Sequence, residues 1–316
     1  MPGITTHYLF GIKAWHRMEK CALRNTISSF HGAYALGEQG PDPYFFHPIA
    51  RIRKAGNPAD IMHHEGLGPF LMALFQYAGD LPRGKERACT EAYAAGFLGH
   101  YELDSAVHPY VYGVSDPQAS HDINTLETHF FLENDLDTAL LYRMKGMDLK
   151  DFRMHATISM TPYMHRAVGE ALTAACQSAY PDMKAGYFLM RTGITAERMA
   201  LFLLEDRTRL KKKLAIWVEK KLFGHPIFSG IVGSKDPEIS MEDPFNLRKT
   251  GWVNPWQTDK VRTESLPELM NGAFDRYLEG LSMLNTYFSS TDGDRKERVY
   301  NKLAAFVGNR SLHSGL

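Results

Sequence analysis

Five side chains that commonly bind metal ions lie in two groups near the middle of the chain. The first group is His100, Asp104 and His108, and the second is His129 and Glu133. Neighbouring members of each group are four residues apart, a spacing that places side chains on one face of an α-helix. Imidazole and carboxylate ligands without a thiolate favour zinc at a catalytic rather than a structural site. The pattern therefore predicts a metallohydrolase.

Three further candidate ligands precede these two groups. They are His7 near the start of the chain, Asp42 in the segment QGPDPYFF, and His63 in IMHHEG. His63 is followed by His64, and we expect only one of the two to face a metal. Each candidate also has a plain structural interpretation, because an aspartate in a Pro-rich loop is often a turn residue and a lone histidine is often part of a core.

The ordered set of candidates resembles the ligands of the zinc-dependent phospholipase C family and of its relatives, the single-strand-specific zinc nucleases. The resemblance is carried by the order of the ligands and by the spacings from His100 to Asp104 and from His129 to Glu133. The metal site covers Met1 to about Glu133, and a loose similarity that includes the WVNPW segment runs through most of the chain. Members of these families hold three zinc ions in an all-α fold, so the resemblance implies that fold and up to three zinc ions here. It also favours His63 over His64.

Carried over residue by residue, the resemblance assigns each candidate to a zinc ion. Asp42, His63, His100 and Asp104 would hold one zinc, Asp104 would bridge to a second zinc held by His7 and the N-terminus, and His108, His129 and Glu133 would hold the third. Zinc pairs activate water and bind the oxygens of a phosphodiester. Asp42 is in addition a candidate catalytic residue that orients or deprotonates the attacking water.

The chain departs from the family at the N-terminal ligand and in one spacing. No secretory signal is evident, so the N-terminal ligand would be Met1 or, after removal of the methionine, Pro2. The interval from Asp104 to His108 is shorter than is usual in the family, which predicts a different local turn.

The substrate pocket of the family does not carry over. Choline-specific members have an aromatic residue after the aspartate and another three residues before the histidine, where this chain has Pro43 and Asp60. Tyr44, Phe45 and Phe46 are candidates to line a replacement pocket. Phosphodiester chemistry is therefore expected, but choline recognition is not.

The expected activity is hydrolysis of a small-molecule or lipid phosphodiester by zinc-activated water. A single-strand-specific zinc nuclease or a nucleotide phosphoesterase is the alternative on the same metal site, because metals and fold do not select the leaving group. A non-catalytic helical binding protein stabilised by zinc is an alternative of another class.

Composition limits the partners and the compartment. Lys plus Arg and Asp plus Glu are both 36, so there is no overall basic field to attract nucleic acid or an anionic membrane. The segment Arg207–Lys213 with Lys220 and Lys221 is more simply a solvated helix face than a phosphate or membrane patch. Three separate cysteines fit a reducing cytoplasm. No apolar stretch approaches the roughly 18 to 20 residues of a transmembrane helix.

Helical periodicity dominates the chain and predicts an all-α protein. The expected helices are Thr5–Met18, Ala59–Ala78, Arg87–Val107, His121–Met144, Pro162–Ser178, Ala196–Phe223, Ser265–Phe288 and Asp294–Val307.

Pro and Gly mark the expected breaks between these helices. Pro109 is expected to end a helix just after His108, and residues 37–48 are expected to form a rigid irregular loop. We expect a phospholipase C-like helical domain over residues 1–224. Residues 225–316 would add a Pro- and Gly-rich segment and two C-terminal helices that pack on this domain.

Overall fold

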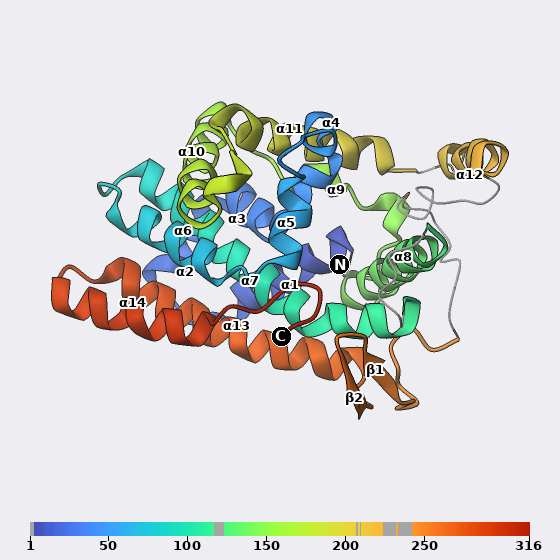
Figure 1. Ribbon diagram of the computed structural model, residues 1–316. Coiled ribbons are helices and arrows are strands. Elements are labelled where there is room, and N and C mark those ends of the chain that lie inside the picture. The colour runs from blue at the N-terminus through green and yellow to red at the C-terminus, as the bar shows by residue number, and fades with distance from the viewer. Residues whose placement is uncertain (1–2, 117–122, 207, 209, 224–231, 233–241) are drawn as a thin grey trace.

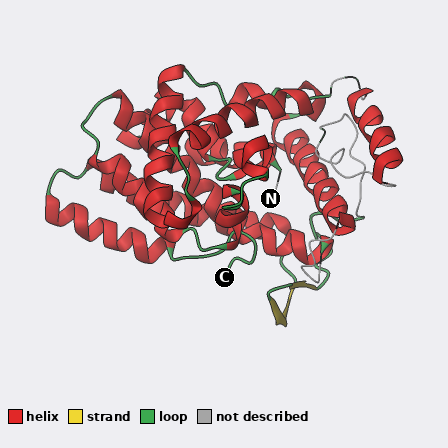
Figure 2. Ribbon diagram, turned by 45° about the horizontal axis from the view of Figure 1, so that its top comes forward, coloured by secondary structure: helices red, strands yellow, loops and turns green. Residues whose placement is uncertain are grey.

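The computed structural model describes residues 3–116, 123–206, 208, 210–223, 232 and 242–316. Helices make up most of this part of the chain, and its single sheet has two strands (Figures 1 and 2). The expected all-α class is confirmed. No helix in the described ranges is both long enough and apolar enough to cross a membrane.

The helices fall into fourteen α-helices and three short 3₁₀-helices within the described residues. The α-helices are α1 (Ile4–Arg17), α2 (Ala22–Ser29), α3 (His31–Gly37), α4 (Pro48–Arg51), α5 (Pro58–His64), α6 (Gly68–Asp80), α7 (Lys85–Ser115), α8 (Ile123–Lys145), α9 (Met154–Thr157), α10 (Pro162–Ala179), α11 (Tyr187–Leu204), α12 (Leu210–Phe223), α13 (Leu266–Ser289) and α14 (Gly293–Val307). The 3₁₀-helices are η1 (Asp42–Phe46), η2 (Leu149–Asp151) and η3 (Pro181–Met183), and the strands are β1 (Trp252–Asn254) and β2 (Gln257–Arg262).

The long helix α7 forms the centre of the molecule. It packs against α3, α6, α8, α10 and α13, while α13 and α14 lie along one side of it (Figure 1). Gly37 and Gly96 allow α3 and α7 to cross closely, since a Cβ on Gly96 would lie 2.1 Å from the Tyr34 carbonyl oxygen. This close crossing places the end of α3 against the middle of α7, where three of the predicted ligands lie.

The expectation that Pro109 ends its helix is wrong. α7 continues through Pro109 to Ser115. Proline in a helix interior costs about 3 kcal/mol through its lost hydrogen bond and ring clash. Val107, Tyr110 and Val111 are buried around it, and their packing offsets that cost. Asp104 and His108 stand one helical turn apart on α7, and the turns beyond Pro109 add Tyr112 and Ser115 to the same helix.

Two expected helices are each divided in two. The segment 59–78 forms α5 and α6, because Pro69 begins a helix more readily than it continues one. The segment 196–223 forms the end of α11 and all of α12. Between them the buried Asp206 carboxylate accepts hydrogen bonds from the backbone N–H groups of Thr208 and Lys212, which starts the second helix.

Several elements were not expected, among them the short helices α2, α3 and α9, η1 and the β1–β2 hairpin. The predicted irregular loop at residues 37–48 contains η1, and Asp42 is its first residue. The WVNPW segment forms part of the β1–β2 hairpin, whose Trp252 is buried against the ring of Tyr110 at 5.4 Å. Short strands of this kind give little periodicity in a sequence.

The predicted division of the chain at residue 224 stays a prediction. Residues 224–231 lie outside the described part of the chain. Within it, α13 packs against α7, and α14 packs against α6 and α13.

Candidate metal centre

The structure brings all eight predicted ligands together in the interior. His7 comes from α1, Asp42 from η1, His63 from α5, three from α7, and two from α8. All eight are buried. Their ligand atoms form three groups, each with every atom within 4.8 Å of the others, and the first two share His100: His7, His100 and Asp104; Asp42, His63 and His100; and His108, His129 and Glu133.

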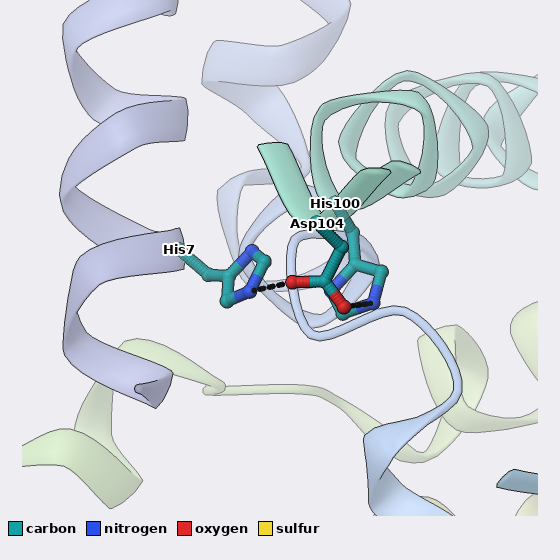
Figure 3. A group of neighbouring side chains, drawn as sticks. All are labelled: His7, His100 and Asp104. Carbon is teal, nitrogen blue, oxygen red and sulfur yellow. Dashed lines mark hydrogen bonds and ion pairs between the residues drawn. The ribbon is translucent and has the colours of Figure 1, made fainter. Parts of the chain in front are cut away.

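Asp104 lies where two of these groups meet. Its Oδ1 is 3.0 Å from His7 Nε2, and its Oδ2 is 3.2 Å from His100 Nε2 (Figure 3). The same Oδ2 is 3.7 Å from His63 Nε2. The rings of His7 and His100 stack at 4.4 Å. One carboxylate therefore reaches histidines from three helices, the arrangement that a bridge between two cations requires.

Three histidines share one hydrogen-bonding pattern. The Nδ1–H of His63 donates to the Ala59 carbonyl at 2.8 Å, and that of His100 donates to the Glu38 carbonyl at 3.2 Å. The Nδ1–H of His108 donates to the Leu312 carbonyl at 2.9 Å. A carbonyl oxygen can only accept, so each Nδ1 carries the proton and each Nε2 keeps its lone pair.

The Nε2 atoms left by this pattern have no hydrogen-bond partner, although His63, His100 and His108 are fully buried. Both oxygens of the buried Asp42 also lack a hydrogen-bond partner. Buried polar atoms without partners are costly and rare. Metal-bound histidines are commonly held in this way, with a backbone carbonyl accepting from Nδ1–H while Nε2 faces the metal. The residues therefore fit zinc.

The third group is held by the end of α7 and by α8. His129 Nε2 is 2.7 Å from Glu133 Oε1, and the same oxygen is 4.0 Å from His108 Nε2. The Ser115 hydroxyl donates to the Val111 carbonyl, so its oxygen can accept the Nδ1–H of His129 at 3.3 Å. Ser115 is available for this contact only because α7 continues past Pro109.

Burial keeps the imidazoles of His7 and His63 neutral by lowering their pKa values. It lowers the pKa of His7 to about 4, helped by the neighbouring His100, and it lowers the pKa of His63 to about 3. Both imidazoles are neutral at pH 7, which is the form that binds metal.

Burial acts oppositely on the two aspartates. It raises the pKa of Asp42 well above its usual range, and the nearby Asp104 adds to the effect. Burial also opposes ionisation of Asp104, but His100 and His7 outweigh it and hold the pKa of Asp104 well below its usual range. A bound divalent cation would favour the ionised form of both carboxylates.

A C-terminal strap, residues 309–316, crosses this centre and was not anticipated. Arg310 pairs with the buried Glu102 at 2.7 Å, Ser311 donates to the His63 carbonyl at 2.9 Å, and Leu312 accepts from His108. The ring of His313 lies 5.2 Å from that of His63 and 5.5 Å from that of His108. The tail sequence has no spacing or periodicity that would place it here.

Aromatic side chains line the third group, but they are not the expected ones. The Tyr112 ring lies 4.8 Å from His129 and 5.1 Å from Trp256, and Trp256 stacks on His313 at 6.2 Å. The prediction that Tyr44 lines a pocket is wrong. Tyr44 is buried and donates to the Met190 carbonyl at 3.3 Å, because its 3₁₀-helix packs on α11.

Phe45 is the member of the predicted aromatic trio that lies at the metal centre. Its half-buried ring is 5.2 Å from that of His63. The predicted N-terminal ligand, Met1 or Pro2, lies outside the described residues.

A buried glutamate near Asp42 was also missed. Glu197 on α11 is fully buried, and neither of its side-chain oxygens has a hydrogen-bond partner. It belongs to the buried stripe that includes Met190, Ile194 and Leu201. A charged residue inside an apolar helical stripe was the signal that could have found it.

Comparisons with protein-family models, with curated proteins and with solved structures gave no match for this chain. The likeness to the phospholipase C family therefore rests on the order, spacing and chemistry of the ligand residues.

Proposed function

We propose that the protein is a zinc-dependent phosphodiester hydrolase that resembles phospholipase C in fold and metal site. The observation that carries the proposal is the shared pattern of His63, His100 and His108, whose Nε2 atoms are buried without a hydrogen-bond partner. Those of His63 and His100 lie near Asp104, and that of His108 lies 4.0 Å from Glu133. The three ligand groups, two of which share His100, equal in number the three zinc ions that the resemblance implies.

Zinc would supply a water of lowered pKa, about 7, and positive charge for the phosphoryl oxygens. The protein's own residues would hold the metals and handle protons. Asp42 has two unpartnered oxygens, so one can accept a proton from an attacking water while the other serves as a ligand. The backbone carbonyls behind His63, His100 and His108 keep these imidazoles in the metal-binding tautomer.

A nuclease or nucleotide phosphoesterase is the second candidate, and one observation favours it. Tyr112 and the partly exposed Trp256 lie beside the third ligand group, and nucleobases stack on aromatic rings of this kind. The chain's balanced charge disfavours long polyanions, so a short oligonucleotide or a nucleotide is the form this candidate would take.

The compartment we propose is the cytoplasm. Cys21, Cys89 and Cys176 are all free thiols, and two of them are buried. Free thiols fit a reducing compartment.

The first test is metal content by mass spectrometry, paired with hydrolysis of bis-p-nitrophenyl phosphate before and after chelation. We expect close to three zinc ions per chain and turnover that chelation abolishes and zinc restores. Panels of lipid and nucleotide phosphodiesters would then separate the two hydrolase candidates. Bound zinc without turnover on any of them would indicate a non-catalytic zinc-stabilised binding protein.

Two histidine–carboxylate pairs provide a matched control. His129→Ala removes a histidine that lies 2.7 Å from Glu133, and His155→Ala removes one that lies 2.7 Å from Glu205 outside the ligand groups. We expect the first substitution to lower zinc content and turnover and the second to change neither. Equal effects of the two substitutions would contradict the assignment of the site.

A further inference from the structure

Helix α12 presents apolar side chains to solvent. Leu210, Leu214 and Trp217 are each more than half exposed, at 68%, 61% and 56%, and Val218 is 37% exposed. At about 100° per residue, these four positions form one continuous strip along the helix. A surface helix normally turns such a strip toward its own core.

Polar contacts hold α12 in this orientation. Lys212 and Glu219, on the opposite side of the helix, are buried. The Lys212 ammonium lies 5.3 Å from the centre of the Phe131 ring on α8, and its backbone N–H donates to Asp206 at 2.8 Å. α12 stands at the edge of the molecule beside α8 (Figures 1 and 2). The strip is thus an outward face that the described part of the chain leaves accessible.

Lysines border the apolar strip on both sides. Lys211 lies on one side, Lys213 and Lys220 lie on the other, and all three are exposed. The exposed Lys221 places its ammonium 4.2 Å from the centre of the Trp217 ring. The only acidic residue in the sequence of α12 is Glu219, which is buried. The face therefore combines apolar side chains with lysines, and α12 itself places no exposed acidic residue beside them.

The apolar face continues onto the end of α11. Phe202 and Leu203 are exposed there, at 58% and 63%. Lys211 connects the two helices, since its ammonium donates to the Leu203 carbonyl at 3.3 Å and lies 5.9 Å from the centre of the Phe202 ring. Exposed apolar side chains that adjoin in this way mark interaction surfaces more often than scattered ones do.

We propose that this α12 surface docks on an anionic lipid bilayer. Leu and Trp side chains on one face, with lysines along its borders, are the features of a helix that lies in the membrane interface. The lysine stems can extend beside the strip and place their ammonium groups among anionic head groups. A second copy of the chain fits less well, because a symmetric contact through this face would bring lysines against lysines.

The chain's net charge of zero does not oppose this docking. Attraction to a charged surface falls off within a Debye length, about 8 Å at physiological salt, so the local lysines decide it. The lysine run is solvated, as its sequence suggests. The apolar strip between the lysines adds exposed hydrophobic surface, which a count of charges does not reveal. Docking can also be measured without turnover, so its failure would leave the hydrolase proposal standing.

Vesicle flotation with the whole 316-residue chain tests the docking. The vesicles are phosphatidylcholine alone or phosphatidylcholine and phosphatidylserine at about seven to three. We expect binding to the mixed vesicles that weakens as salt is added. We expect the double substitution Leu214→Ser with Trp217→Ser to reduce it about tenfold or more, and Lys213→Gln, Lys220→Gln and Lys221→Gln together to reduce it by a similar factor.

Matched variants change equally exposed residues elsewhere. Ile52→Ser with Val261→Ser removes two exposed apolar side chains, and Lys20→Gln, Lys54→Gln and Lys302→Gln together remove three exposed charges. These variants should bind as the unchanged protein does. Absence of vesicle binding would overturn the proposal, as would equal loss in the matched variants. A concentration-dependent dimer that the α12 double substitution abolishes, without vesicle binding, would assign the face to a second copy instead.

Discussion

The Nδ1–H of His108 donates to the backbone carbonyl of Leu312 at 2.9 Å, across 204 residues of sequence. One residue belongs to the central helix and the other to the C-terminal strap. Because the bond fixes the tautomer of a candidate ligand, residues 309–316 take part in the candidate metal centre. The acceptor is a backbone carbonyl, so the type of side chain at position 312 could not have predicted the contact.

Deletion of residues 312–316 should therefore weaken zinc binding at the third ligand group. Loss of an outer-shell partner of a metal-bound histidine typically reduces metal affinity by about 10- to 100-fold. We expect zinc content to fall by about one ion per chain while the circular dichroism of the helices is retained. Isothermal titration of zinc into the metal-depleted protein would measure the change in affinity.

Leu312→Ala is the matched control for this deletion. It removes a buried side chain but keeps the carbonyl that faces His108. We expect lower stability with zinc affinity near that of the unchanged protein. Equal zinc affinity in the deletion and in the unchanged protein would show that the strap does not support the site.

Asp104→Asn should affect two ligand groups at once. Asp104 lies 3.0 Å from His7 and 3.2 Å from His100, so its carboxylate serves the groups on both sides. An amide has no negative charge to offset two neighbouring cations. We expect the loss of about two zinc ions per chain, measured by mass spectrometry on the purified protein.

Glu133→Gln makes the matching change at the third group alone. Its side chain contacts His129 and approaches His108, and neither His7 nor His100 shares its ligand group. About one zinc ion should be lost in this variant. If both substitutions removed the same number of ions, Asp104 would not be a bridge.

Glu197 should make the metal-depleted protein less stable as pH rises. Burial raises the pKa of its carboxyl well above the usual value of 4.5, so the folded state keeps a proton that the unfolded state releases above that pH. The free energy of unfolding should fall with pH from about 4.5 up to the raised pKa, by at most about 1.4 kcal/mol per pH unit. Urea unfolding at a series of pH values would measure this slope.

Substitution to glutamine isolates the contribution of Glu197 to the pH dependence of stability from that of the other titrating groups. Glu197→Gln removes its proton equilibrium at constant size and should flatten the slope, whereas the exposed Glu279→Gln should leave it unchanged. An identical slope in all three proteins would mean that Glu197 does not titrate on unfolding.

If both proposals hold, the α12 surface should matter only for substrate presented on a membrane. The Leu214→Ser and Trp217→Ser double variant changes exposed residues outside the ligand groups. We expect hydrolysis of lipid in anionic vesicles to fall about tenfold, while hydrolysis of soluble bis-p-nitrophenyl phosphate changes less than about twofold. Parallel losses on both substrates would point instead to a disturbance of the metal centre through α8.

Local helix geometry explains which parts of the site were predictable. His100, Asp104 and His108 share one face of α7, and His129 and Glu133 share one face of α8, because a four-residue interval is nearly one helical turn. This relationship holds for any α-helix and needs no knowledge of its neighbours. The main helices could be predicted for the same reason, from their 3.6-residue periodicity.

Predictions failed where packing outweighed a local preference. Pro109 did not end α7, since its flanking residues are buried, and Tyr44 was drawn into the core by α11. Glu197 was overlooked although it lies in a buried stripe. For Pro109 and Tyr44 the deciding term was packing against other elements, whereas Glu197 carried a local signal in its own helix.

The sequence by itself determined the ligand types, their order along the chain and the two helical faces that carry five of them, since these follow from residue identity and from helix geometry. Only the tertiary structure decided that His7, Asp42 and His63 meet His100, that the strap holds His108, and that α12 turns its apolar strip outward. These relationships join residues far apart in sequence. They depend on how whole helices pack, which the spacing of residues within one helix does not encode.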